Sequence, residues 1–346
     1  MKELRFGVVG CGAIGKLQAD VIEQIENAKL VAVCSATEKS AKELATTHSC
    51  DWHTDYAEML EREDIDIVAI CTPSGLHYEQ TIQAGKAKKH VICEKPIDIE
   101  VAKAEEMTRV CKENGVTFSV IFQHRFDGST VAVRKAIEEG HLGKLLWGSS
   151  RSILYRDANY YSTPWRGTWE YDGGGVLINQ AIHTIDLLLE FFGPVKSVSA
   201  KCRRLLHHEI EAEDTAVASI EFANGCLGSI EASTACYPGI YSELSLFGEK
   251  GSVVIKNDKL VYYKLEGGNV SYLDDVLISE EELNAPKGAK IADRSHTTQF
   301  KNVVDAILAG KEPLVTGKSA TNSLELIKAI YKSSDEKREI YLQKHL

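Results

Sequence analysis

The stretch that decides the fold is RFGVVGCGAIGKLQADVI, residues 5–22. It begins with an apolar run typical of a buried β-strand, passes three glycines, Gly10, Gly12 and Gly15, and ends in a helical pattern. The glycines have the G-x-G-x-x-G spacing of turns that hold a dinucleotide pyrophosphate at a helix N-terminus. The same residues also fit a plain tight turn between a strand and a helix, so the rest of the chain must decide.

Near-continuous apolar runs alternate with helical patterns over the first third of the chain. Such runs are typical of strands covered on both faces, and their alternation with helices predicts an α/β fold with a parallel, doubly wound sheet. Because the glycine turn starts this series, we expect a Rossmann dinucleotide-binding domain over residues 1–123. The expected strands lie within 4–10, 29–35, 66–73, 90–96 and 116–123, and the expected helices within 14–25, 40–47, 76–87 and 101–114.

The pattern changes after residue 123. A helical stretch at 129–143 is followed by a loop rich in aromatic residues and glycine at 155–175 and by a second helical stretch at 176–193. Alternating strands then surround Asn224-Gly225, which predicts a hairpin. We expect residues 124–346 to form an α+β domain for substrate binding and oligomerisation, built on a large, mostly antiparallel, open-faced sheet. One option left open is that the last residues pack back on the first domain.

Composition excludes several classes of protein. The net charge of −10, without a Lys/Arg-rich run, argues against nucleic-acid binding. No apolar run approaches the roughly 20 residues that span a bilayer, so no membrane association is expected. The nine cysteines are scattered singly, which argues against a metal site or a disulfide framework. Without a secretion signal at the start of the chain, we expect a cytoplasmic protein with no metal.

The end of the second expected strand bears on the choice of cofactor. A carboxylate there would bind the ribose 2′-OH of NAD, but this chain has Ser35, followed by Thr37 and Lys39. Hydroxyls and a lysine suit a 2′-phosphate better, so NADP is slightly favoured over NAD. The alternative is that Thr37 caps the following helix while Lys39 is solvated.

Two further places carry side chains suited to acid–base chemistry. Lys95 follows an apolar strand at the carboxyl edge of the sheet, where ligands bind, and desolvation there would lower its pKa; the alternative is a solvated lysine. Asn179, His183 and Asp186 have the i, i+4, i+7 spacing of one helix face. His183 is a natural proton acceptor near neutrality, or else a hydrogen-bonded core residue, and Asp186 is expected to brace the structure.

The motifs GCGAIG, CTPSGLH, CEKP and GGGVLINQAIHTIDLL, in this order over the full chain, resemble the Gfo/Idh/MocA family of nicotinamide-dependent oxidoreductases. The resemblance implies a Rossmann domain followed by an α/β domain whose open sheet builds homodimers or homotetramers. It also implies oxidation or reduction of a secondary alcohol on a sugar, an inositol or a sugar nucleotide.

The resemblance assigns roles to individual residues. Lys95 matches the family's active-site lysine and His183 its helix histidine. Asn179, a catalytic candidate, departs from the Asp of inositol dehydrogenase-like members, which puts a proton relay through this position in doubt. Glu94 and the loop with Thr72, Pro73 and His77 match positions near the cofactor. The expected cofactor-binding set is Gly10, Gly12, Ala13, Ile14, Gly15, Ser35, Thr37, Lys39, Thr72, Pro73, His77, Glu94 and Lys95.

The aromatic loop suggests the substrate side of the site. YYSTPWRGTW followed by INQAIH is similar to the branch that includes sugar 3-dehydrogenases. There Arg166 would bind an anionic or polyhydroxyl substrate, and Trp165 or Tyr161 would stack on a sugar; the alternative is a packed loop with a surface arginine. The expected substrate-binding set is Arg125, Tyr161, Trp165, Arg166, Asn179 and His183, with His296 as a lesser candidate.

The expected reaction is hydride transfer between a sugar-type CH–OH carbon and the nicotinamide. His183 would take the hydroxyl proton and Lys95 would stabilise the developing alkoxide. Two alternatives remain at this stage. One is a redox cycle with tightly held NAD that cleaves a glycosidic bond or eliminates across a sugar ring. The other is a non-catalytic protein that senses cofactor or sugar.

Overall fold

The chain folds as two units, each built around its own sheet. The first unit comprises residues 1–123 and 288–321, and the second comprises 124–287 and 322–346. The structure is a computed structural model that describes residues 3–279, 283 and 291–342. The two units are described separately below.

The sheet of the first unit is parallel throughout, with strand order β3-β2-β1-β4-β5-β6. This is the doubly wound order, in which ligands bind at the carboxyl ends of the strands where the order reverses, here between β1 and β4. All five expected strands are present. The sheet also has a short polar edge strand, β3, which we did not predict because it contains no apolar run. The strands are β1 Leu4–Val9, β2 Ala28–Cys34, β3 Asp51–His53, β4 Ile67–Ile70, β5 His90–Cys93 and β6 Phe118–Val120.

Helices cover this sheet, and their apolar faces form its core. Phe6 of β1, Ile22 of α1 and Phe300 of α11 are fully buried in one cluster, with the rings of Phe6 and Phe300 at 6.2 Å between centroids. Burial of large apolar side chains is the main stabilising term of such a core. The helices are α1 Ala13–Glu23, α2 Glu38–His48, α3 Tyr56–Leu60, η1 Ser74–Leu76, α4 His77–Lys86, α5 Val101–Glu113 and α11 Ile291–Ala309.

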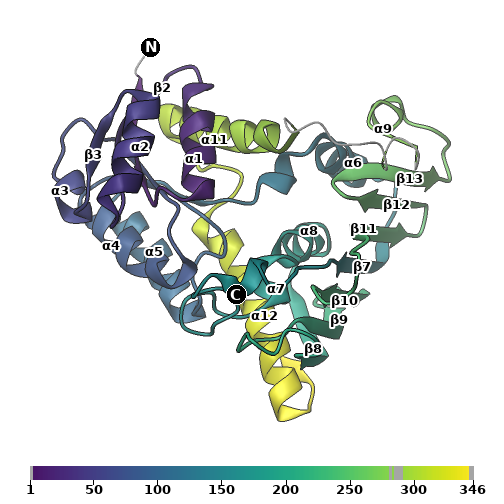
Figure 1. Cartoon of the computed structure of the whole chain (residues 1–346). Helices are drawn as coiled ribbons and strands as arrows, with labels where there is room; N and C mark the ends of the chain where they lie inside the picture. Colours follow the sequence, from purple (N-terminus) through teal and green to yellow (C-terminus); the bar gives the residue numbers. More distant parts are fainter. Residues whose placement is uncertain (1–2, 280–282, 284–290, 343–346) are drawn as a thin grey trace. The chain divides into compact units, whose positions relative to one another are not determined.

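Helix α11 corrects the expected domain boundary. We expected every residue after 123 to belong to the second domain, but residues 288–321 group with the first unit. Gln299 of α11 accepts the backbone N–H of Phe122 at 3.0 Å and donates to the carbonyl of Val120 at 2.8 Å, and α11 lies beside α1 (Figure 1). An amphipathic pattern shows that a helix is covered but not which sheet covers it.

The sheet of the second unit has eight strands in the order β13-β12-β11-β7-β10-β9-β8-β14. Every neighbouring pair is antiparallel except β7 with β10. This is the mostly antiparallel sheet that the sequence predicts. The strands are β7 Leu145–Ile153, β8 Val195–Arg203, β9 Thr215–Phe222, β10 Leu227–Ser233, β11 Tyr241–Gly248, β12 Gly251–Lys256, β13 Lys259–Leu265 and β14 Ile340–Tyr341.

Helices α7 and α8 lie on one face of this sheet (Figure 1). A Cβ on Gly148 of β7 would lie 2.4 Å from the Phe192 ring of α8, so glycine allows the helix to approach the strand closely. The helix expected over 176–193 is broken, because the N–H of Ala181 bonds to the carbonyl of Val176 at 2.9 Å, one residue beyond the α-helical spacing. The helices of this unit are η2 Gln123–Phe126, α6 Gly128–Glu138, η3 Tyr160–Ser162, α7 Val176–Asn179, α8 Ile182–Phe192, α9 Ser271–Asp274 and α12 Gly317–Glu336, which belongs to this unit from residue 322 on.

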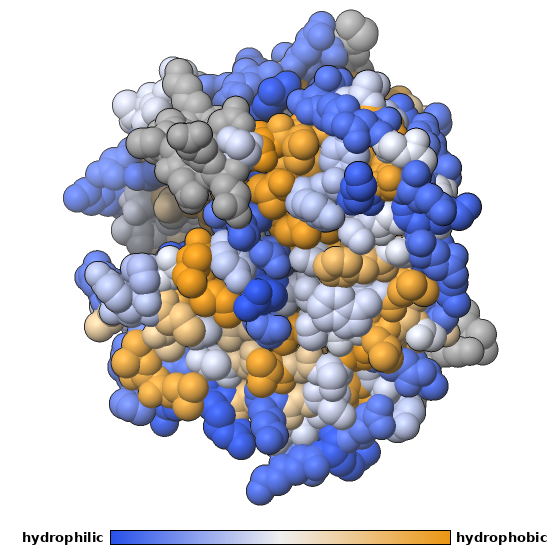
Figure 2. All heavy atoms as spheres, turned by 90° about the vertical axis from the view of Figure 1, so that its right-hand side faces the viewer, coloured by the Kyte–Doolittle hydropathy of each residue, from blue (hydrophilic) through white to orange (hydrophobic). Residues whose placement is uncertain are grey.

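The opposite face of the sheet, which we call the open face, carries the side chains of alternate residues on each strand. In β9 and β10 these include Val217 and Leu227, which are 51% and 56% exposed. Across the middle of the open face the register aligns five serines: Ser199, Ser219, Ser229, Ser149 and Ser245. Figure 2 views the molecule from the side of these strands and shows hydrophobic patches between hydrophilic side chains. None of the helices in the described part of the chain has both the length and the apolar character needed to cross a bilayer.

Candidate active site

The glycine turn between β1 and α1 is shaped for a dinucleotide. Gly10 has φ +97°, and a Cβ there would lie 2.6 Å from the carbonyl oxygen of Cys71. A Cβ on Gly15 would lie 1.8 Å from the carbonyl oxygen of Gly10, whereas one on Gly12 would meet no described atom within 4 Å. Gly10 and Gly15 are therefore required by close packing, and Gly12 leaves open space beside the N-terminus of α1. That space, with the free N–H groups of the helix at Ala13 and Ile14, fits a pyrophosphate.

The end of β2 carries the side chains expected to meet the ribose of the cofactor. The Ser35 hydroxyl accepts the backbone N–H of Thr37 at 3.3 Å. Thr37 occupies the N-cap position of α2, but its side chain makes no capping bond, so the hydroxyl is not used there. The Lys39 side chain is 83% exposed, with its ammonium 3.9 Å from Glu43. No acidic side chain follows β2 directly, as the sequence already shows.

The loop after β4 is held in place by a buried histidine. His77 is 1% exposed, with Nδ1 at 2.9 Å from the carbonyl oxygen of Pro96 and Nε2 at 2.9 Å from that of Thr72. Burial lowers the pKa of His77 and thereby favours its neutral form. His77 therefore braces the loop from inside, whereas Thr72 and Pro73 are half-buried on it.

The Glu94-Lys95 pair lies at the carboxyl end of β5. Gln18 of α1 donates to Glu94 Oε1 at 2.5 Å and accepts from the Cys71 thiol at 3.0 Å, so the buried Glu94 is fixed from two neighbouring elements. Its other oxygen accepts the backbone N–H of Lys95 at 3.2 Å. Lys95 is half-buried at the same strand edge as Gly10 and Thr72, the edge where ligands bind in parallel sheets.

In the second unit, Asn179 is held by a buried aspartate. Its Nδ2 donates to Asp172 Oδ1 at 2.8 Å, and Asp172 Oδ2 accepts the backbone N–H of Gly167 at 2.9 Å. The Tyr160 hydroxyl donates to Asn179 Oδ1 at 3.4 Å. The carboxylate that Asn179 itself lacks is thus supplied by Asp172, which we did not single out in the sequence because it precedes the glycine run rather than lying on the helix.

A buried carboxyl group sets the start of the short helix that carries Asn179. Glu213 accepts the backbone N–H groups of Gly175 and Leu177, each at 3.0 Å, and the Tyr331 hydroxyl at 3.0 Å. Burial raises the pKa of Glu213 to about 7, although its hydrogen bonds act in the opposite direction. Glu213 therefore acts as the N-terminal cap of α7.

His183 lies in the first turn of α8 and lines a small cavity. Its ring lies 4.9 Å from that of His124 between centroids, at 87° to it. The cavity has a volume of about 130 Å³ and is lined by His124, Gln180, His183, Thr184, Leu187, Ser242, Asn257 and Asp258. Its walls offer donors and acceptors suited to a hydroxyl-bearing ligand.

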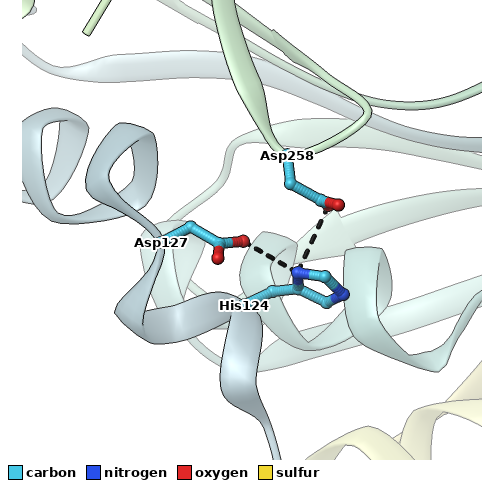
Figure 3. Close-up of side chains that lie close together, drawn as sticks. All are labelled: His124, Asp127 and Asp258. Atoms are coloured by element: carbon cyan, nitrogen blue, oxygen red, sulfur yellow. Dashed lines mark hydrogen bonds and ion pairs between the residues drawn. The ribbon is translucent and has the colours of Figure 1, made fainter. Parts of the chain in front are cut away.

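His124 belongs to a small group of charged side chains (Figure 3). Its Nδ1 lies 2.7 Å from Asp127 Oδ2 and 3.3 Å from Asp258 Oδ1. The three ligand atoms lie within 4.8 Å of one another, which is compact enough for a metal ion. The short contact with Asp127 is that of a hydrogen bond donated by Nδ1–H, so we interpret the group as a hydrogen-bonded histidine. No sequence pattern indicates this group, because Asp258 is remote along the chain from the other two residues.

Arg125 and Tyr161, two of the expected substrate contacts, bond to other residues of the second unit. The Arg125 guanidinium is buried and donates to both oxygens of Asp186 at 2.6 and 2.7 Å. Asp186 also accepts the Ser323 hydroxyl at 3.0 Å, so it braces the fold as we expected. Tyr161 is 8% exposed, with its hydroxyl 2.8 Å from that of Thr234. Both side chains are thus committed to packing within the second unit.

The other members of the aromatic loop surround Tyr160. The Arg166 guanidinium lies 4.1 Å from the centroid of the Tyr160 ring and 5.3 Å from that of Trp165. Trp165 and Arg166 are half-buried, so both remain partly accessible. His296 lies on α11 in the first unit and is buried. From the sequence we named Tyr161 and not Tyr160, since adjacent tyrosines in a loop have no periodicity that shows which one is buried.

Comparison with known proteins agrees with this geometry. Residues 4–122 match the family model of an oxidoreductase NAD-binding Rossmann fold, and residues 134–342 match the model of the C-terminal alpha/beta domain of the same oxidoreductase family. The chain is 27% identical to a myo-inositol 2-dehydrogenase of Thermotoga maritima, covering 98% of this chain and 99% of that protein. It is 26% identical to a 2,7-anhydro-N-acetylneuraminate hydratase of Mediterraneibacter gnavus, covering 99% and 97%.

A solved structure agrees over the whole chain. The WlbA dehydrogenase of Bordetella pertussis, in complex with NADH and UDP-GlcNAcA, superimposes with a TM-score of 0.91 at 31% identity, covering 99% of this chain and 98% of that one. The two domain matches and the glycine turn together show that this chain belongs to the Gfo/Idh/MocA oxidoreductase family, whose N-terminal domain is an NAD-binding Rossmann fold.

Proposed function

We propose that this protein is a dehydrogenase or reductase that transfers a hydride between a nicotinamide cofactor and a secondary alcohol or ketone of a sugar, a sugar nucleotide or an inositol. The observation that carries the proposal is a lysine, Lys95, at the ligand-binding edge of a sheet whose glycine turn fits a dinucleotide. The names of the inositol dehydrogenase and of the WlbA dehydrogenase support the class of substrate.

In the proposed mechanism, the bound cofactor supplies the hydride-transfer chemistry and the chain moves the proton. In the oxidative direction, His183 accepts the proton of the substrate hydroxyl. The Lys95 ammonium donates a hydrogen bond to the same oxygen and stabilises its developing negative charge. Asn179, fixed by Asp172, donates or accepts a hydrogen bond at a neighbouring hydroxyl but cannot take up a proton.

The test is turnover by the wild type and by Lys95→Ala. Purified protein is assayed by absorbance at 340 nm with NAD⁺ and NADP⁺ against inositols, hexoses and UDP-sugars. We expect at least one substrate to be oxidised, and Lys95→Ala to lower kcat by about 10²-fold or more while the dissociation constant of the reduced cofactor changes little. Normal kcat in Lys95→Ala at saturating cofactor would contradict the role given to Lys95.

We propose further that NADP is used somewhat better than NAD. Support comes from the hydroxyls of Ser35 and Thr37 at the end of β2, where an acidic side chain would repel a 2′-phosphate. The measurement is kcat/KM for both cofactors in the wild type and in Ser35→Asp. The aspartate is expected to lower the NADP⁺-to-NAD⁺ ratio by about tenfold or more through charge repulsion, and an unchanged ratio would contradict this placement of the ribose.

A second candidate function is a redox cycle without net change of the cofactor. The hydratase relative favours it, because hydration of a sugar derivative gives no net oxidation or reduction. In that case product forms without a lasting change at 340 nm, and a dehydrogenase instead gives one reduced cofactor per product.

We also propose that the protein forms homodimers or homotetramers and works in the cytoplasm. The open face supports self-association, since it exposes apolar side chains such as Val217 and Leu227 next to a central row of small serines. Nicotinamide cofactors and single, unpaired cysteines are typical of cytoplasmic enzymes, which supports the location.

A further inference from the structure

Two arginines of the second unit lie at one tyrosine ring. The guanidinium carbon of Arg166 lies 4.1 Å, and that of Arg156 5.1 Å, from the centroid of the Tyr160 ring. The backbone fixes both arginines from different sides of the loop. The N–H of Arg156 bonds to the carbonyl of Thr234, and the N–H of Arg166 to that of Thr163. Two like charges are therefore held near one ring by the fold itself.

Neither arginine has an acidic partner within 4.0 Å in the part of the chain that the structure describes. Arg166 donates one bond, to the backbone carbonyl of Tyr160 at 3.0 Å. Asp157, the residue that follows Arg156, accepts the backbone N–H of Tyr160 instead. The other described arginines that are not exposed all have a carboxylate partner, namely Arg5, Arg62, Arg125, Arg134 and Arg151.

Burial makes this arrangement unfavourable without a further group. Both guanidiniums are half-buried, and the Nε atoms of Arg156 and Arg166 have no hydrogen-bond partner among the described residues. The tyrosine ring attracts each cation weakly, but it does nothing against their mutual repulsion. An anion with several oxygens would pair with both charges and accept their remaining N–H groups.

The arginine pair is connected to the residues of the proposed reaction. The Tyr160 hydroxyl, at the far end of the same ring, donates to Asn179 Oδ1 at 3.4 Å and accepts from Gln180 Nε2 at 2.9 Å. Gln180 lines the same cavity as His183. One rigid tyrosine therefore separates the two cations from the polar side chains around His183, all within the second unit.

We propose that Arg156 and Arg166 bind an anionic group of the substrate, so that this enzyme acts on an acidic sugar, carrying a carboxylate or a phosphate, rather than on a neutral polyol. The proposal rests on the proposed function, because it assigns the class of substrate at the same site. Tyr160 positions both guanidiniums and does not itself take part in the reaction.

Binding to the NADH-loaded protein tests the proposal without requiring turnover. Each acidic probe is paired with a counterpart that lacks its carboxylate or phosphate: glucuronate and glucose 6-phosphate with glucose, and UDP-glucuronate with UDP-glucose. We expect one acidic class to bind at least about tenfold more tightly than its match, which is the scale of one charge-assisted hydrogen bond. A preference for glucuronate and UDP-glucuronate identifies a carboxylate, and a preference for glucose 6-phosphate identifies a phosphate.

Variants connect the preference to the arginines. Arg156→Gln and Arg166→Gln should each weaken binding of the preferred acid about tenfold or more and leave binding of its paired counterpart within about twofold. Arg166→Lys keeps the charge and should restore part of the loss. Arg109→Gln, which removes an exposed guanidinium from α5 in the first unit, is the matched control and should change neither. NADH affinity reports that each variant is folded.

Any of three results would overturn the assignment. They are equal binding of each acidic probe and its counterpart, no binding of any acidic probe, and a preference for the acid that remains in both Gln variants. Turnover is scored separately at 340 nm. If the acid binds specifically through the arginines but no probe is turned over, the result supports the anion site and contradicts the proposed dehydrogenase activity. If a neutral polyol is turned over and neither arginine variant changes this, the result supports the dehydrogenase activity and contradicts the anion site.

Discussion

Among single residues, Asn179 is interpreted differently once its hydrogen-bond partners are known. The sequence has an amide where the family resemblance implies an Asp, and this alone suggests lost chemistry. In the structure Asp172 accepts from Asn179 and fixes the amide so that Oδ1 faces Tyr160. A negative charge thus remains one hydrogen bond away, and it acts on the orientation of a polar group rather than as a proton carrier.

We therefore predict that Asp172→Ala impairs catalysis more than its effect on stability implies. The change leaves the Nδ2 of Asn179 and the N–H of Gly167 without their acceptor, which costs roughly 1–3 kcal/mol of unfolding free energy per buried donor. Free rotation of the amide should lower kcat/KM by about tenfold or more.

Steady-state kinetics and urea unfolding measure the two effects of Asp172→Ala. Glu170→Ala, which removes an exposed acid from the same loop, is the control and should change kcat/KM little. Full activity in a destabilised Asp172→Ala protein would limit Asp172 to packing.

At the scale of the element, the helical segment 176–193 depends on a buried acid at its start. Sequence periodicity predicted one helix, and the structure has two, α7 and α8, with the break at Gln180 and Ala181. Glu213, from the neighbouring β-rich segment, accepts backbone N–H groups at the start of α7. It thereby fixes where α7 begins, and with it the positions of Asn179 and His183 along the segment. No local pattern announces a cap that is contributed from elsewhere in the chain.

Glu213 should make stability depend on pH. Its pKa is raised from 4.5 to about 7 by burial, so the folded state holds its proton more tightly than the unfolded chain does. The stabilising contribution of the neutral form is complete below about pH 4.5 and is lost as pH rises through about 7, at up to about 1.4 kcal/mol per pKa unit.

The measurement is urea unfolding at pH 5 and pH 8 for the wild type and Glu213→Gln. The glutamine imitates the neutral acid, so the variant should lose less stability than the wild type over this interval. Asp98, whose pKa burial raises to about 6, contributes in the same direction in both proteins and cancels from the comparison. Parallel pH profiles of the two proteins would show that Glu213 is charged in the fold throughout.

For the whole molecule, the open face is the surface through which we propose that the protein self-associates. Serines at the centre allow a second sheet to approach closely, and the apolar side chains beside them supply area to bury. Beside the serines, a second row across the strands carries side chains of alternating charge. In it Arg151 pairs with Glu231 at 3.0 Å and Lys256 with Glu243 at 3.6 Å. Such neutralised charges favour association over solubility of an isolated sheet.

Ser229→Arg is predicted to break this association. Ser229 lies between Ser219 and Ser149 in the middle of the row, where a long charged side chain would hold two sheets apart. Light scattering should then show a species of lower mass than the wild type. Ser271→Arg, at an exposed position outside the sheet, serves as the control and should leave the mass unchanged. A monomeric wild type, or an unaltered mass in Ser229→Arg, would contradict the role of the open face.

The local features of this protein could be predicted from its sequence: the glycine turn, the alternation of strands and helices around a parallel sheet, the hairpin at Asn224-Gly225, and the places of Lys95 and His183 in their elements. These follow from backbone conformation and hydrophobic period, which nearby residues set. Four features became visible only in the folded chain. Helix α11 packs with the first sheet, Arg125 bonds to Asp186, Asp172 accepts a hydrogen bond from Asn179, and Arg156 and Arg166 both lie at the Tyr160 ring. Each of these depends on contacts between residues distant in the chain or turned toward one another by an aperiodic loop, and no short-range pattern encodes such contacts.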